Sequence, residues 1–178
     1  YINLGDGPDP PPDVFPKALA AAKRAIQLDS TVALGWAALS HYHTYFGKDW
    51  TLAEHAFERA NELNPNLSDN HYHRAWYLAL FGRMNEAIAE HKLAQELDPF
   101  VPLHTAWLGS LYKMVGEYEE GLKETEMAAQ MENGYALSMF VKGNIFIDQG
   151  KEEEGLELLK KASDIHKGWD IQYGPALI

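Results

Sequence analysis

Histidine is the side chain best placed to carry chemistry in this sequence, because eight are present and four of them form two similar pairs. The pairs are His41–His43 and His71–His73, each with a tyrosine between the histidines. Histidine pairs suggest metal ligation, but residues two apart on an α-helix point about 200° apart, so neither pair can chelate an ion by itself. We therefore predict no bound metal and no cofactor. A metal or small-molecule sensor centred on His41, His71 and Trp76 stays as an alternative.

Other patterns that would indicate catalysis are missing from the sequence. It contains no cysteine, no G-x-S-x-G, no H-E-x-x-H and no Gly-rich phosphate loop after a strand. The acidic clusters Glu119–Glu120 and Glu152–Glu154 fall at the expected starts of helices, where carboxylates complement the helix dipole. We predict that the chain has no catalytic residues and is not an enzyme.

Composition narrows the classes of partner. The 178 residues carry a net charge of −11, and 46% of them are hydrophobic, which is ordinary for a folded globular chain. A surface this acidic repels phosphate backbones and anionic lipid, so we expect neither nucleic acid nor membrane as a partner. The lack of cysteine and of a long apolar run suits the cytoplasm, which is the expected compartment.

The elements that must position these side chains are paired helices. The stretch Trp36–Pro65 has apolar residues every three or four positions, and its second half has a continuous small-and-aromatic stripe: Ala53, Phe57 and Ala60. Pro65 and Pro99, which follow expected second helices, are 34 residues apart. The glycines expected between paired helices recur at intervals of 35, 34 and 34 residues: Gly47, Gly82, Gly116 and Gly150.

A period near 34 with this internal pattern resembles the tetratricopeptide repeat (TPR) family, and in particular TPR regions of longer bacterial proteins. The resemblance covers nearly the whole chain and implies an all-α fold, a right-handed α-solenoid of antiparallel helix pairs. It divides the chain into a partial repeat at 1–30, four repeats at 31–65, 66–99, 100–133 and 134–167, and the start of a further helix or cap at 168–178.

The two ends of the sequence suggest a fragment of a longer protein. Residues 1–5 have the spacing of the end of a first helix, and a Pro- and Gly-rich connector follows up to Pro12. We expect Asp13 to cap the next helix, whose buried stripe would be Ala18, Ala22, Ala25 and Leu28.

The resemblance also implies where a ligand would bind, because first helices of such repeats line a concave face that usually takes a peptide or a partner helix. Carried over by phase, the residues that would line this groove are His41, Tyr45, Tyr72, Trp76, Lys113, Phe140 and Asn144. The four aromatic rings would anchor the ligand, and the other three side chains would supply orienting hydrogen bonds. The alternative for each ring is packing between adjacent repeats.

Two further functions are weighed against this one. Some members of the family grip a C-terminal carboxylate with several Lys, Arg and Asn side chains, but only Asn144 fits that set here, which argues against such a clamp. Self-association through exposed ends, as a homodimer or as a scaffold segment of a larger regulatory protein, is the main alternative.

Four local predictions follow from the repeat pattern. Asp49 should cap the second helix of the first full repeat, and Trp50 should pack in its core. His43 should face the core or that second helix. Gly121 and Gly155 recur at the same helical phase, so we expect close helix–helix approach at both positions.

Overall fold

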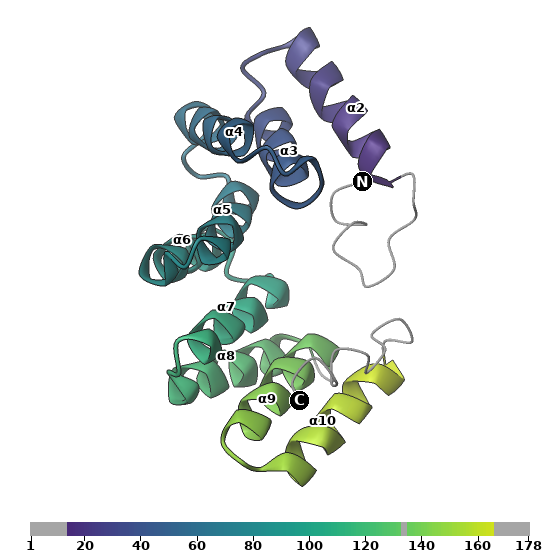
Figure 1. Cartoon of the computed structure of the whole chain (residues 1–178), viewed down its shortest axis with the longest axis vertical. Helices are drawn as coiled ribbons and strands as arrows, with labels where there is room; N and C mark the ends of the chain where they lie inside the picture. The colour runs from purple at the N-terminus through teal and green to yellow at the C-terminus, as the bar shows by residue number, and fades with distance from the viewer. Residues whose placement is uncertain (1–13, 133–134, 166–178) are drawn as a thin grey trace. The chain divides into compact units, whose positions relative to one another are not determined.

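The computed structural model describes residues 14–132 and 135–165, and it builds them from helices joined by short turns (Figure 1). The predictions for residues 1–13 and 166–178 lie outside these ranges. Within the described ranges there is no strand, and no helix is long and apolar enough to cross a membrane. The helices are α2 (Val14–Leu28), α3 (Ala33–Tyr42), the π-helix η1 (His43–Gly47), α4 (Trp50–Leu63), α5 (Ser68–Leu80), α6 (Met84–Leu97), α7 (Pro102–Met114), α8 (Tyr118–Met131), α9 (Ala136–Asp148) and α10 (Glu152–Ile165).

The prediction of an all-α helical-repeat fold is confirmed, and the chain separates into two compact units, Tyr1–Arg83 and Met84–Ile178. The first unit holds α2 to α5 and the second holds α6 to α10. Each predicted repeat interval contains two α-helices, and the division between the units falls inside the interval 66–99. The two units are described separately below.

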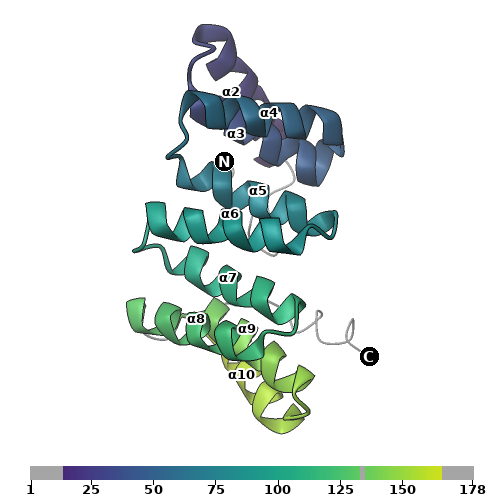
Figure 2. The ribbon, with the colours of Figure 1, turned by 90° about the vertical axis from the view of Figure 1, so that its left-hand side faces the viewer.

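The first unit is built on the hairpin of α3 and α4, against which α2 and α5 pack (Figure 2). The predicted stripe on α4 is its core: Ala53, Ala56, Phe57 and Ala60 are each at most 1% exposed. The predicted stripe on α2 is only half right. Ala18 and Ala22 are buried, but Leu28 is 69% exposed, because it ends the helix beyond the part covered by α3.

The end of the first helix in this hairpin differs from the prediction. Residues His43–Gly47 form a π-helix, and Lys48, not Gly47, takes the left-handed conformation, with φ of 47°. The equivalent turns at Gly82, Gly116 and Gly150 have φ between 72° and 81°. Lys48 lies 34 residues before Gly82, so the extra residue of the first repeat is taken up by the wider π turn. Asp49 caps α4 as predicted, because its side chain accepts a hydrogen bond of 3.1 Å from the Leu52 N–H.

The second unit is built on two hairpins, α7 with α8 and α9 with α10, and α6 packs against α7. Its apolar core joins α7, α8 and α9 through Ala106, Ala128, Leu137, Val141 and Ile145, each at most 2% exposed.

Glycines let the helices of both hairpins approach closely, as predicted for Gly121 and Gly155. A Cβ added to Gly155 would lie 2.7 Å from the Gly143 carbonyl oxygen on α9. A Cβ added to Gly121 would lie 3.0 Å from the Gly109 carbonyl oxygen on α7. Since a backbone oxygen cannot move aside as a flexible side chain can, the glycines set the helix spacing in this unit.

Candidate functional site

The first predicted groove residue, His41, is buried against α5. Its Nδ1 lies 2.7 Å from Nδ1 of His73, and the two rings meet edge to face with centroids 4.0 Å apart. Burial lowers the pKa of His41 to about 4, so its ring is neutral at pH 7 and one imidazole donates to the other. We expected His41 to meet Tyr72 or Trp76, whereas the contact that the structure describes joins it to His73.

The other histidines of these pairs also serve the fold. His71 is buried, and its Nε2 donates to the Pro65 carbonyl oxygen at 2.8 Å, which ties the start of α5 to the turn after α4. The structure thus brings His41 together with His73, not with His71. Among the described residues, no group of three or more acidic or histidine side chains is arranged to hold a metal ion.

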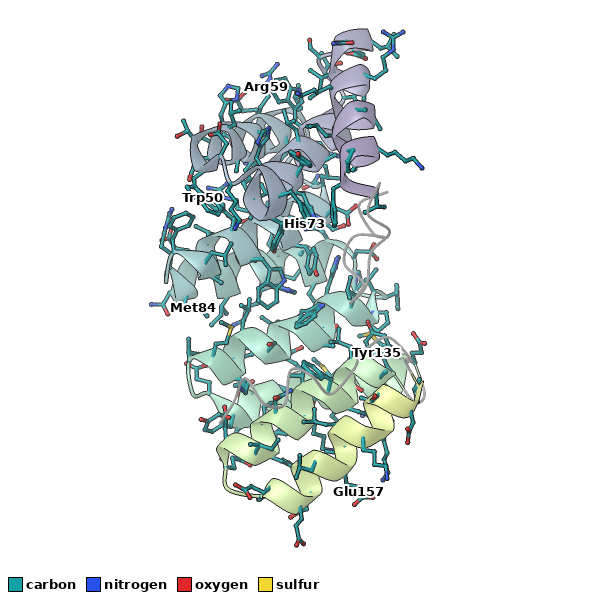
Figure 3. The ribbon with its side chains drawn as sticks, turned by 45° about the vertical axis from the view of Figure 1, so that its right-hand side comes forward. Trp50, Arg59, His73, Met84, Tyr135 and Glu157 are labelled. Atoms are coloured by element: carbon teal, nitrogen blue, oxygen red, sulfur yellow. The ribbon has the colours of Figure 1, made fainter. Side chains whose placement is uncertain are left out.

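The predicted aromatic anchors of the first unit differ in exposure. Tyr72 is 6% exposed, and its ring packs 4.8 Å from that of His73. Tyr45 and Trp76 are half-buried, and the Tyr45 ring packs 4.9 Å from that of His41. His41, His73 and Tyr72 therefore form a buried polar and aromatic layer, and Tyr45 rests on it with part of its surface open to solvent (Figure 3).

The three predicted groove residues of the second unit interact within the chain. Phe140 is half-buried and packs against the apolar core of α7, α8 and α9. Asn144 donates its side-chain N–H to the Phe140 carbonyl oxygen at 2.8 Å. The Lys113 ammonium lies 3.0 Å from the Asp148 carboxylate, with both side chains largely covered. A ligand would meet a neutralised Lys113 here instead of an isolated cation.

The structure shows a pocket that sequence reasoning did not find. It lies in the first unit between α4 and the C-terminal end of α5, and it has a volume of about 440 Å³. Its lining residues are Trp50, Thr51, Glu54, His55, Glu58, Tyr77 and Phe81. The prediction that Trp50 packs in the core was wrong, because 39% of its surface is exposed and its ring stands at the edge of this pocket (Figure 3).

A signal for this pocket was present in the sequence. Glu54 and Glu58 are four residues apart, as are Tyr77 and Phe81, so each pair lies on one helix face. The phase that we assigned to the groove excluded all four residues.

Comparison with solved structures identifies the fold. The chain matches the magnetosome-type protein title "MamA 41-end from Desulfovibrio magneticus RS-1" with a TM-score of 0.67 and 15% identity, over 88% of each chain. It matches YrrB, described as "a TPR protein with an unusual peptide-binding site", with a TM-score of 0.62 and 22% identity, over 86% of this chain and 78% of that one. It matches PilW, a type IV pilus biogenesis factor, with a TM-score of 0.73 and 16% identity, over 84% of this chain and 69% of that one.

These structural neighbours are TPR proteins, and this chain has the TPR fold that the repeat period predicted. No protein-family model matches the sequence, and no curated protein matches it. The likeness therefore lies in how the helices pair.

Proposed function

We propose that this chain is a non-enzymatic protein–protein interaction module that binds a peptide or a partner helix on its first helices. The observation that carries the proposal is the partly exposed ring of Tyr45, held on the buried His41–His73 pair of the first unit. Tyrosine and tryptophan rings fixed in this way are typical anchors of interfaces, because they bury much area and lose little side-chain entropy.

Trp76 adds a second accessible ring on α5, one turn after Tyr72. Leu34 on α3 and Leu80 on α5 have the same predicted phase and are 54% and 58% exposed. Exposed apolar side chains at the groove phase of two neighbouring helices favour a ligand with apolar side chains. Comparison with YrrB supports this class of ligand, since that TPR protein is described by its peptide-binding site.

In the second unit, we assign Phe140 to the same role, with Asn144 and Lys113 beside it. Asn144 fixes the backbone of α9 at Phe140, and the ion pair of Lys113 with Asp148 links α7 to α9. These contacts hold the Phe140 ring against the core, so that its accessible edge keeps one orientation.

The test is selection of peptides from a random displayed library on the purified chain, followed by calorimetric titration of the best binder. We expect Tyr45→Ala and Trp76→Ala each to weaken binding about tenfold or more, since interface anchors commonly contribute 2 kcal/mol or more. Phe100→Ala is the matched control, because Phe100 is an aromatic residue that is 88% exposed and lies outside the predicted set. Equal affinity of all three variants for the peptide would refute the proposal.

Self-association is the alternative function, and the same samples distinguish it. Sedimentation velocity at several protein concentrations would then show a mass that rises with concentration and falls in the Tyr45→Ala and Trp76→Ala variants. A constant monomer mass together with specific peptide binding supports the interaction module.

A further inference from the structure

The pocket between α4 and α5 is separate from the groove residues of the same unit. Tyr77 and Phe81 follow each other by one turn on α5, and Tyr77 is rotated about 100° from Trp76 around the helix axis. Both pairs of residues thus use the same helix but face different directions. What binds at one site need not touch the other.

Three aromatic rings form one side of the pocket. Trp50 and Phe81 meet nearly at right angles, at 88° with centroids 5.4 Å apart, and Tyr77 and Phe81 meet at 54° with centroids 5.0 Å apart. The Tyr77 ring also packs 5.3 Å from that of Phe57, which is 1% exposed, so the rings are seated on the core. Non-parallel rings present several electron-rich faces to one space, and this arrangement favours a cation.

Two carboxylates form the other side. Glu54 accepts a hydrogen bond of 2.6 Å from the Tyr77 hydroxyl, and Glu58 lies one turn further along α4. Burial, with a smaller contribution from Glu54, raises the pKa of Tyr77 to about 12, so this hydroxyl stays a donor and holds Glu54 in place. In the described part of the chain, neither Glu54 nor Glu58 forms an ion pair with a lysine or arginine.

The positive side chains nearby do not line the pocket. Arg74 and Arg83 are close enough to Tyr77 to oppose the rise of its pKa, but neither is among the lining residues. The exposed fractions of Trp50 and Phe81, 39% and 50%, leave their rings open to a ligand from solvent.

We propose that this pocket binds an arginine side chain of a partner polypeptide. A planar guanidinium can stack on the face of Trp50 or Phe81 while its N–H groups pair with Glu54 and Glu58. Lysine would gain the charge interaction but not the stacking, so it should bind more weakly. The net charge of −11 attracts basic segments toward the chain as a whole, and the pocket selects among them.

The test uses two blocked tripeptides, Ac-Gly-Arg-Gly-NH₂ and its neutral twin with citrulline in place of arginine. The probe is the indole N–H resonance of Trp50 in two-dimensional NMR, identified by its loss in Trp50→Phe. At low ionic strength we expect a saturable shift with arginine and a Kd on the order of 1 mM, typical of one small contact group. The citrulline peptide should bind at least about tenfold more weakly, and the lysine peptide should fall between them.

Variants decide whether the pocket is responsible. Glu54→Gln with Glu58→Gln should abolish the preference for arginine over citrulline, and Phe81→Leu should weaken both peptides. The charge-matched control is Glu62→Gln with Glu96→Gln, which removes two exposed carboxylates away from the pocket lining. Circular dichroism confirms that each variant is folded.

Two outcomes would overturn the proposal. Equal shifts with arginine and citrulline would show that the pocket does not recognise the charge, and equal losses in the pocket and control variants would show general attraction to an acidic surface. Trp76→Ala should leave the arginine titration unchanged, so that this result and the peptide-selection result succeed or fail separately.

Discussion

The contact between Gly143 and Gly155 gives a prediction that opposes intrinsic helix propensity. In an isolated helix, Gly155→Ala should stabilise by about 1 kcal/mol, because alanine is the better helix former. In this structure the new Cβ would lie 2.7 Å from the Gly143 carbonyl oxygen and 2.6 Å from Cγ1 of Ile147. Ordinary van der Waals contact begins near 3.4 Å, so α9 and α10 would have to separate by about 0.7 Å at this point.

Such overpacking typically costs 1–3 kcal/mol, and a fixed backbone oxygen places this site near the upper end. After subtraction of the propensity gain, we expect a net loss of about 1–2 kcal/mol, which lowers Tm by roughly 3–6 °C for a chain of this size. Thermal unfolding followed by circular dichroism at 222 nm measures the shift.

The control for propensity is Ala89→Gly on the exposed face of α6, which should cost about 1 kcal/mol. A second expectation concerns the double variant Gly143→Ala with Gly155→Ala. Because one separation of the two helices makes room for both methyl groups, its loss should be smaller than the sum of the single losses. A Gly155→Ala protein that melts at or above the wild-type temperature would refute the reasoning.

Three further predictions concern the turn, the histidine pair and the ion pair. Lys48→Gly should raise stability by about 0.5–1 kcal/mol in urea titration, because glycine takes a φ of 47° without strain; an unchanged midpoint would contradict this. The pKa of His41 is about 4 in the folded chain against 6.5 unfolded, so its contribution to stability is present above pH 6.5 and is lost as pH falls toward 4. His41→Gln should remove up to about 1.4 kcal/mol per pH unit from the slope of unfolding free energy in that window, and an identical slope would count against a buried neutral ring. The Lys113–Asp148 pair should give a coupling of about 0.5–1 kcal/mol in a double-mutant cycle with Lys113→Met and Asp148→Asn, reduced in 1 M salt; zero coupling in low salt would contradict the contact.

Much of the fold could be predicted from sequence because each repeat states the same instruction in local terms. Turn glycines, the Asp49 cap and the alanine-rich stripes act over a few residues, and the structure places them as expected at most positions. The exception is the turn after α3. One inserted residue has several local solutions there, and the choice of a π turn with Lys48 in the left-handed conformation depends on packing that periodicity does not describe.

The site was harder to predict, because helical phase gives direction but not depth. His41 and Tyr72 have the phase of groove residues, yet both are buried by contacts with other helices. Trp50 was assigned to the core by its similarity in position to Tyr118, but it stands at the rim of a pocket. Exposure of a ring depends on the size of its neighbours on the next helix, and repeat spacing alone does not supply that information.

The inserted residue in η1 also determines where one aromatic ring points. Tyr45 lies in the middle of this wider turn, and its ring reaches His41 only from there. Deleting one residue from His43–Gly47 would tighten the turn to an ordinary α-helical one and rotate later side chains by about 100°. The repeat would then match its neighbours in length, and the tyrosine would lose its seat on the imidazole. In this chain, an irregularity of length acts as an aiming device.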